Sequence, residues 1–280
     1  MKATTIAHLR RVAIERLRPI SETPALDADL LLGAVLGLER AALLAGQDHP
    51  VDQRAQARYA ELIARAAAGE PIAYLLGRRG FYDRDLIVTP AVLIPRPETE
   101  LLLEQALAWT ADRPAVRAAD IGTGCGALAV TFAAHRPESA VWAVDLSVGA
   151  LAVARRNARA NGVNVHFIQG DLLTPLIERA MRFDLLMANL PYIPSAELPA
   201  LAVSRHEPWL ALDGGPDGLA LIRRLLAQAP SVCAPGALLL LEIGAGQGDA
   251  VSALAAALQP QSIAVLRDYA GHDRIVRIAL

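Results

Sequence analysis

The chain has 280 residues, 54% of them hydrophobic, and a formal net charge of -2 at pH 7. That length is enough for one large core, or for an ordinary domain with a smaller companion. No apolar run reaches the roughly 18 residues of a membrane span, no early segment has a signal-peptide pattern, and no Lys/Arg block suits a nucleic-acid backbone. We therefore expect a globular cytoplasmic protein without membrane contact or direct nucleic-acid binding.

The cysteine and histidine content argues against a metal centre. Cys125 and Cys233 are too few for a disulfide framework or a metal cluster, and the six histidines are scattered without ligand spacing. Two free thiols suit a reducing compartment. We expect no bound metal.

Residues 1–84 have a helical pattern. Helix starts are indicated at Thr4 or Thr5 and at Thr23-Pro24 after Ser21, and the segment from His49 to Asp52 separates two further helices. This part has 12 Lys and Arg against 10 Asp and Glu, a balance that suits a protein partner better than an RNA backbone. The pattern predicts a small all-helical domain.

The segment from Phe81 to Glu100 contains Pro90, Pro95 and Pro97. Proline is excluded from helix interiors and moves the preceding residue out of the α region, so the segment must be extended. We expect residues 85–110 to form a strap or hairpin, followed by a first helix, that joins two domains and lines a cleft.

From residue 111 to 280, β-rich runs alternate with helix-length segments. Such alternation predicts an α/β fold, a Rossmann-like and mostly parallel sheet with helices on both faces. The last run follows its predecessor after a short turn, which predicts an antiparallel edge hairpin. The predicted strands are Val116 to Asp120, Ala140 to Asp145, Val165 to Gln169, Phe183 to Ala188, Ala237 to Glu242, Ser262 to Arg267 and Arg274 to Ala279.

A glycine loop, Asp120-Ile121-Gly122-Thr123-Gly124-Cys125-Gly126, follows the first of these strands and precedes a helix from about Ala127. Glycines allow close backbone approach to a ligand at a helix N-terminus, which indicates a nucleotide-like cofactor. The spacing also fits a dinucleotide fingerprint with Asp145 as the ribose-binding carboxylate. Asp120 favours a ligand with an ammonium group, because a carboxylate there would repel a pyrophosphate. The structural alternative for Asp120 is a helix cap.

Two more carboxylates follow strands. Asp145 ends the second strand and suits ribose hydroxyls, or it caps the next helix with Ser147. Asp171 follows the third strand and suits an exocyclic amine, with Leu172 packed on the adenine ring, unless the two form an ordinary loop. The carboxyl edge of an open α/β sheet is where ligands bind, so one site accounts for all of these positions.

The tetrapeptide Asn189-Leu190-Pro191-Tyr192 follows the fourth strand. An Asn oxygen and a backbone carbonyl can accept both hydrogens of a planar NH2 group while the Tyr ring packs on its flat face, which leaves the nitrogen lone pair free. A methyl acceptor nitrogen needs this arrangement. The alternative is a simple exit from strand to loop.

With these motifs the chain resembles class I S-adenosylmethionine-dependent methyltransferases and, within that class, the release-factor glutamine N5-methyltransferase family. The family's usual tetrapeptide is Asn-Pro-Pro-Tyr, and Leu190 here replaces its first proline. We expect the geometry to survive, because a residue before proline is held extended. Besides the glycine loop and the tetrapeptide, the resemblance rests on Glu70 to Gly77, Val92 to Glu100, Glu207-Pro208, Ala211 to Leu219 and Leu241 to Gly244.

The resemblance implies methylation of the Gln side-chain amide in the Gly-Gly-Gln motif of release factors, with S-adenosyl-L-methionine as donor. It implies a monomer in which residues 1–84 bind the release factor and residues 111–280 form the methyltransferase domain. Arg96 is predicted to contact the substrate or the cofactor, with an ion pair to Glu98 or Glu100 as the alternative. The implied catalytic and substrate-binding residues are Asn189, Leu190, Pro191 and Tyr192. The implied cofactor-binding residues are Asp120, Gly122, Thr123, Gly124, Cys125, Gly126, Asp145, Asp171, Leu172 and Asn189.

Two alternatives stay open. Asn-Leu-Pro-Tyr also resembles the motif of ribosomal RNA adenine dimethylases, so a nucleic-acid adenine N6-methyltransferase is the second enzyme hypothesis. Such enzymes are expected to have a basic surface, which the sequence lacks. The third hypothesis is an inactive adaptor with the same fold, against which the intact motifs argue.

Overall fold

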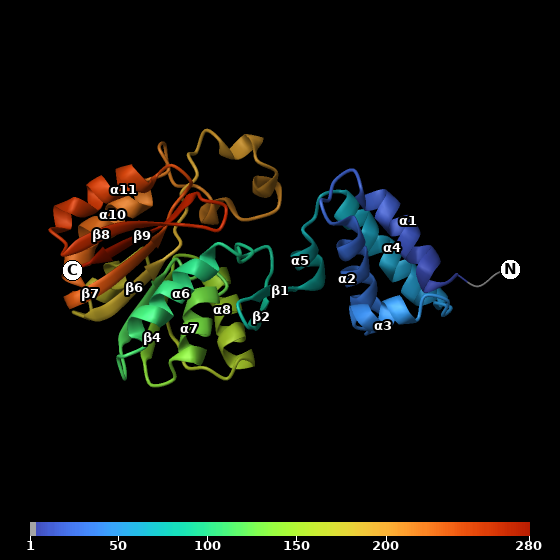
Figure 1. Ribbon diagram of the computed structural model, residues 1–280, viewed down its shortest axis with the longest axis horizontal. Coiled ribbons are helices and arrows are strands. Elements are labelled where there is room, and N and C mark those ends of the chain that lie inside the picture. The colour runs from blue at the N-terminus through green and yellow to red at the C-terminus, as the bar shows by residue number, and fades with distance from the viewer. Residues whose placement is uncertain (1–3) are drawn as a thin grey trace. The chain divides into compact units, whose positions relative to one another are not determined.

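The computed structural model describes residues 4–280, and the chain folds into two compact units (Figure 1). The first unit ends at Gly77, and the second runs from Arg78 to Leu280. The hairpin that opens the second unit, β1–β2, has its turn at Tyr82 and Asp83.

The first unit is helical over its described residues. Local signals set the helix ends, since the side chains of Thr5 and Asp52 accept backbone N–H groups at the starts of α1 and α4, and Gly37 ends α2 at φ 67°. Its core is built mainly from Leu and Ile, including Leu17 and Leu31. The helices are α1 (Ile6–Leu17), α2 (Pro24–Leu36), α3 (Arg40–Ala45), α4 (Gln53–Ala67) and α5 (Ile72–Leu76).

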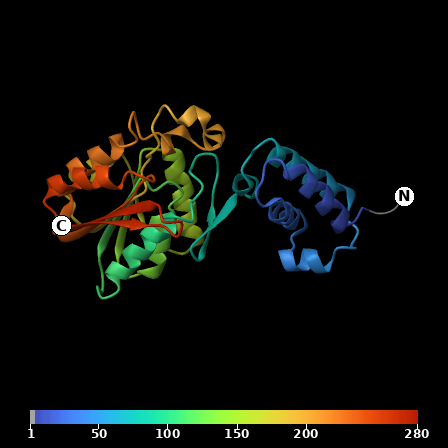
Figure 2. The same cartoon turned by 45° about the horizontal axis from the view of Figure 1, so that its top comes forward.

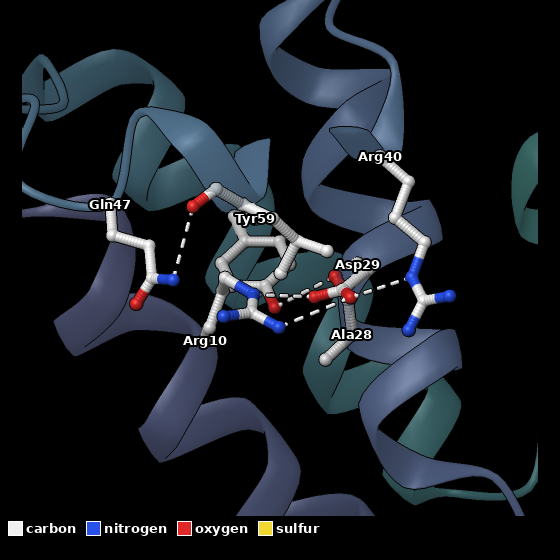
Figure 3. A network of polar contacts seen from close by, with 7 residues as sticks. Arg10, Ala28, Asp29, Arg40, Gln47 and Tyr59 are labelled. Atoms are coloured by element: carbon white, nitrogen blue, oxygen red, sulfur yellow. Dashed lines mark hydrogen bonds and ion pairs between the residues drawn. The ribbon is translucent and has the colours of Figure 1, made fainter. Parts of the chain in front are cut away.

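Asp29 is a buried carboxylate in this helical core, only 1% exposed (Figure 3). The Arg10 guanidinium donates to both of its oxygens, and Arg40 Nε donates to Oδ2 at 3.0 Å. Beside them the Tyr59 hydroxyl donates to the Ala28 carbonyl, and the Gln47 amide donates to a nearby backbone carbonyl. Burial acts to raise the pKa of Asp29, but hydrogen bonds from the two arginines bring it below its usual value.

The second unit contains a short antiparallel hairpin and a larger sheet flanked by helices. Short 3-10 turns occupy much of the segment between β6 and α10. The strands are β1 (Arg78–Phe81), β2 (Arg84–Ile87), β3 (Arg117–Ile121), β4 (Ala140–Asp145), β5 (His166–Gln169), β6 (Phe183–Ala188), β7 (Cys233–Glu242), β8 (Ser262–Arg267) and β9 (Asp273–Ala279). The helices are α6 (Thr99–Thr110), α7 (Ala127–His135), α8 (Val148–Ala160), α9 (Thr174–Ile177), α10 (Ala220–Gln228) and α11 (Gly248–Ala255).

Within residues 4–280 the larger sheet has seven strands in the order β5-β4-β3-β6-β7-β9-β8. Helices α6, α7 and α8 cover one face, and α10 and α11 cover the other (Figures 1 and 2). Every pairing from β5 to β7 is parallel, whereas β9 is antiparallel to both β7 and β8. The predicted fold class is therefore confirmed, with β9 placed between β7 and the edge strand β8.

The strand order reverses between β3 and β6, which makes their carboxyl ends the switch point of the sheet. The register pairs Ile121 of β3 with Ala188 of β6, and Ala188 in turn with Leu241 of β7. The glycine loop, the turn formed by residues 189–192 (the Asn189 turn) and Glu242 therefore lie next to one another at the ends of three adjacent strands.

The strand bounds agree closely with those expected, and β4, β6 and β8 match them fully. The main difference is β7, which starts at Cys233 instead of Ala237. Pro235 and Gly236 are poor strand residues, but pairing of Cys233 with Phe183 extends the strand back across an irregularity in the ladder. None of the helices formed by the described residues is long and apolar enough to cross a membrane.

Candidate active site

A cavity of about 240 Å³ lies at the carboxyl edge of the sheet. Its wall is formed by the glycine loop, the ends of β4 and β5, the start of the Asn189 turn and residues 91–93. These three residues belong to the proline-rich segment of residues 89–97, called the proline strap below. Predicted site residues that line it are Gly122, Gly124, Asp145, Asp171, Leu172, Asn189, Leu190 and Pro191. The structure thus brings most of the predicted residues together around one cavity of the second unit.

The glycine loop turns its backbone toward this cavity. Gly122 and Gly124 have φ of 75° and 57°, values that side chains other than glycine rarely adopt. The Gly122 amide is bonded to the Val144 carbonyl, and the Gly124 amide donates to Asp145 Oδ2 at 2.8 Å. The loop is therefore fixed to the end of β4, and Gly122 and Gly124, which line the cavity without side chains, leave room for a ligand.

Asp145 faces the cavity, and no cation among the described residues is bonded to it. Its Oδ1 accepts the Ser147 amide and its Oδ2 accepts the Gly124 amide, while Ser147 itself caps α8. Burial raises the pKa of Asp145, and these backbone hydrogen bonds partly offset that rise. A carboxylate held from behind by two amides keeps lone pairs available for ligand hydroxyls.

Asp171 and Leu172 also line the cavity, just after Gly170, whose amide donates to the Asp145 carbonyl. Leu172 is buried and has φ 51°, which turns the chain sharply after β5. Asp171 pairs with Arg224, and both line the cavity. The arrangement offers a flat apolar surface beside a carboxylate, which fits an adenine ring with its exocyclic amine.

Four predicted cofactor residues lie behind the cavity wall: Asp120, Thr123, Cys125 and Gly126. Asp120 accepts the Thr123 hydroxyl at 2.6 Å and the Ala129 amide at 3.2 Å, and burial raises its pKa to about 7. Burial also raises the pKa of the Cys125 thiol to about 12, so it is not a nucleophile. These residues shape the loop, and their part in cofactor contact stays a prediction.

The Asn189 turn packs directly on the glycine loop. Leu190 is only 3% exposed, and a Cβ added to Gly122 would lie 3.0 Å from Leu190 Cδ2. The leucine in place of the family's usual proline therefore fills the space above Gly122. The Leu190 side chain is therefore part of the hydrophobic core, while its backbone forms part of the turn.

A second cavity, of about 120 Å³, lies on the other side of the turn. Residues 189–191 line both cavities, and the second is also lined by Arg96, Tyr192 and Glu242. The turn thus forms a wall between a larger cavity that fits a nucleotide-like cofactor and a smaller one that fits a side chain.

Tyr192 is held in place by a loop rich in glycine. The Gln247 amide donates to the Tyr192 carbonyl at 3.1 Å, and a Cβ on Gly218 would lie 2.3 Å from that oxygen. A Cβ on Gly214 would meet Tyr192 Cα at 2.8 Å. Because only glycine permits such approach, the segment from Asp213 to Gly218 is needed to seat the tyrosine.

Arg96 pairs with Glu207, and not with Glu98 or Glu100. The Glu207 carboxylate also accepts the Ile94 amide at 2.9 Å and is 5% exposed. This pair joins the proline strap to the segment that follows Tyr192, next to the smaller cavity. Arg96 lines that cavity, and its contact with substrate stays a prediction.

Sequence reasoning gave no role to Glu242 or Thr99, although both lie beside Asn189. The Asn189 amide donates to Thr99 Oγ1 at 2.9 Å, and Glu242 is 1% exposed at the end of β7. The signal that could have identified Glu242 is its position as a charged residue at the end of an apolar run. Among residues 4–280, no cluster of His, Cys, Asp and Glu could hold a metal ion.

Comparisons with known proteins agree with this geometry. A family model described as the PrmC N-terminal domain matches residues 8–77, and one described as the Methyltransferase small domain matches residues 97–204. The chain is 45% identical to a release factor glutamine methyltransferase of Moorella thermoacetica, over 95% of this chain and 96% of the relative. The chain belongs to the release factor glutamine methyltransferase family. A second member, from Burkholderia pseudomallei, is 46% identical over 86% of this chain and 87% of its own.

A solved structure supports the fold. A methyltransferase from Pyrococcus furiosus superposes with a TM-score of 0.54 at 20% identity, covering 77% of this chain and 95% of that one. The family resemblance inferred from the motifs is confirmed, and so is the class I methyltransferase fold.

Proposed function

We propose that this protein methylates the side-chain amide nitrogen of the Gln in the Gly-Gly-Gln motif of peptide-chain release factors, with S-adenosyl-L-methionine as methyl donor. The observation that carries the proposal is the position of Asn189. It lies in the wall between the larger cavity, which fits the cofactor, and the smaller one, which fits a glutamine side chain. The family membership supports the same substrate.

The residues of the larger cavity fit the cofactor by chemistry. Asp145 offers lone pairs to ribose hydroxyls, Leu172 and Asp171 suit adenine, and the glycine backbone leaves room for the chain between them. When bound, S-adenosylmethionine supplies an electrophilic methyl group on its sulfonium. Asp120, Thr123, Cys125 and Gly126 act from behind by fixing the loop.

The amide of glutamine is a poor nucleophile because its lone pair is delocalised into the carbonyl. Asn189 Oδ1 and the Leu190 carbonyl accept its two hydrogens and favour a pyramidal nitrogen, and they stabilise positive charge that develops on it. Tyr192 packs on the flat face of the amide and excludes water. Arg96, anchored by Glu207, contacts the segment that carries the glutamine.

The helical unit is the proposed binding site for the release factor. Its helices and loops expose large apolar side chains that a protein partner could cover. They are Val12, Ile20, Leu26, Leu30, Leu38 and Leu44. The sequence pI of about 6.3 agrees with a protein partner and not with direct binding to nucleic acid. We also propose that the protein acts as a cytoplasmic monomer, which sedimentation of the free chain will test.

The decisive experiment is mass spectrometry of a release factor incubated with the protein and S-adenosylmethionine. We expect the mass gain of one methyl group on the tryptic peptide with the Gly-Gly-Gln motif, and no gain when the target Gln is replaced by Glu. No gain on that peptide, with labelled methyl found instead in RNA or DNA, would support the adenine methyltransferase. No transfer together with no calorimetric binding of the cofactor would support the adaptor.

A further inference from the structure

Asn189 must present its oxygen, and not its NH2 group, to a substrate amide that itself donates two hydrogens. The two ends of an Asn carboxamide are nearly equal in size, so packing alone does not select one orientation. The structure therefore needs a polar device that recognises the NH2 end. Such a device lies on the side of Asn189 away from the cofactor cavity.

The device is formed by Thr99 and Glu242. The Asn189 NH2 group donates to Thr99 Oγ1 at 2.9 Å, and both side chains are within hydrogen-bonding reach of the Glu242 carboxyl. Thr99 opens α6 and is 4% exposed, and Glu242 closes β7 at 1% exposure. Because Ala188 pairs with Leu241, Asn189 and Glu242 leave adjacent strands side by side.

The Glu242 carboxyl is not an ordinary structural ion. Its Oε2 is buried without a hydrogen-bond partner among the described residues, and the carboxyl lies within hydrogen-bonding reach of the Thr99 and Asn189 side chains. No cation among the described residues bonds to it: Arg274 lies near, but its guanidinium is paired with Asp268. An acceptor-only group held next to Asn189 without a cation is costly to bury, which calls for a functional reason.

We propose that Glu242 is a positioning residue for methyl transfer, acting with Thr99 to hold the Asn189 carboxamide with its oxygen toward the substrate glutamine. An ionised carboxylate offers only lone pairs, so only the NH2 end of Asn189 can face it. The Thr99 hydroxyl accepts a hydrogen from Asn189 and lies within reach to donate its own to Glu242, so it also selects the NH2 end of Asn189. A flipped Asn189 would place its hydrogens against those of the substrate and leave only the Leu190 carbonyl as an acceptor there.

This inference rests on the proposed amide methylation for its purpose, but the orientation itself is measurable without turnover. The chain has only four asparagines, Asn157, Asn161, Asn164 and Asn189, so labelling asparagine with nitrogen-15 gives a simple side-chain spectrum. Replacing Asn189 by Ala assigns its signal. Burial raises the pKa of Glu242 to about 7, with Arg274, Glu98 and Tyr192 as the charged or titratable groups around it.

We expect the Asn189 NH2 signals of the full chain to shift as pH rises through about 7, and this shift to disappear in Glu242→Gln. An Asn189 signal that ignores both pH and the substitution would overturn the proposal. Glu178→Gln, which removes an exposed carboxylate elsewhere, is the matched control and keeps the titration. Circular dichroism of each variant checks that it folds.

The kinetic experiment uses a release factor as substrate at pH 8. Glu242→Gln and Thr99→Val should each lower kcat about 10- to 100-fold, because a misoriented carboxamide loses an interaction needed in the transition state. KM for the cofactor should stay nearly unchanged, and Thr99→Ser should recover most of the rate lost in Thr99→Val. In the wild type kcat should rise with pH as Glu242 ionises, and in Glu242→Gln this limb should vanish. Wild-type turnover in a folded Glu242→Gln would contradict the proposal, whereas absence of turnover in the wild type would instead contradict the proposed function.

Discussion

Buried carboxylates are treated in opposite ways in the two units. In the helical unit, Asp29 is neutralised by Arg10 and Arg40, and its pKa is lowered. In the methyltransferase unit, Asp120, Asp145 and Glu242 lie in or near the site with no cation among the described residues bonded to them, and burial raises the pKa of each. Arginines of its own unit neutralise the charge of Asp29. The other three carboxylates have no such partner among residues 4–280, so their oxygens can accept hydrogen bonds from a ligand or from groups that contact one.

The presence or absence of arginine partners distinguishes buried carboxylates that serve the fold from those proposed to serve the site. A buried carboxylate that serves only the fold is stable when arginines surround it, as Asp29 is. A carboxylate proposed to contact ribose or to orient Asn189, such as Asp145 or Glu242, has no arginine bonded to it among the described residues, and the fold carries the cost of its burial. Substitutions at the two kinds of position should therefore change stability in opposite directions.

Asp29→Ala should give the largest loss of stability. It leaves Arg10, which is largely buried, without its partner, and we expect a loss of about 3 kcal/mol in the free energy of unfolding. Chemical denaturation followed by circular dichroism measures this loss. S-adenosylmethionine binding by the methyltransferase unit should remain. If Asp29→Ala lost no more stability than Arg40→Ala, whose side chain is 53% exposed, burial of the Asp29 ion pair would not be what stabilises the unit.

The same Asp29 pair gives a pH dependence. Because the folded pKa of Asp29 is lowered, its contribution is present above the unfolded pKa and is lost as pH falls through the folded value. The stability difference between the wild type and Asp29→Asn should therefore be full at neutral pH and shrink on acidification below about pH 4. A difference independent of pH would mean that packing, and not charge, is responsible.

Glu207, like Asp171 with Arg224, is a carboxylate of the methyltransferase unit that is paired with an arginine. It lies near the smaller cavity, yet it is paired with Arg96 and with the Ile94 amide, so it resembles Asp29 in its surroundings. We expect Glu207→Ala to lower the free energy of unfolding by about 1 to 3 kcal/mol, since it leaves a buried amide unpartnered. Thermal melting with Glu197→Ala as an exposed control measures the effect. A neutral result would show that a paired carboxylate beside the cavity is not structural.

Glu242→Gln should change stability in the opposite direction. The raised pKa means that the folded state holds a proton that the unfolded state releases, so stability falls as pH rises from about 4.5 to about 7. Removing the charge should therefore raise the free energy of unfolding by about 1 to 2 kcal/mol at pH 8, with little gain at pH 5. Denaturation at both pH values measures it. A clear loss of stability at pH 8 would place Glu242 with Asp29 as a structural ion.

Much of the fold could be predicted because its signals are local. Alternation of β-rich and helical runs gave six of the seven strands of the sheet within one residue, and Thr5 caps the helix that it was expected to open. The start of β7 was missed, since its pairing with β6 outweighs the local preferences of Pro235 and Gly236. A local sequence pattern does not show which strand a segment will pair with, so it could not reveal this extension of β7.

The site was predictable where a motif continues directly from a strand. The glycine loop and Asn189 are brought together by the strand order, as expected for the carboxyl edge. The ion pair of Arg96 with Glu207 and the contact of Asn189 with Thr99 were not foreseen. Each joins residues about 90 or more positions apart, through loops whose course no periodicity reveals.

Asn189 is proposed to orient the glutamine amide for methyl transfer and to do little to hold the cofactor. The most direct test is single-turnover methylation of a release factor by Asn189→Ala at saturating S-adenosylmethionine, with cofactor affinity measured by calorimetry. We predict a rate reduced by about 100-fold or more, with cofactor affinity nearly unchanged. Near wild-type turnover, or a loss of rate explained fully by weaker cofactor binding, would contradict the account.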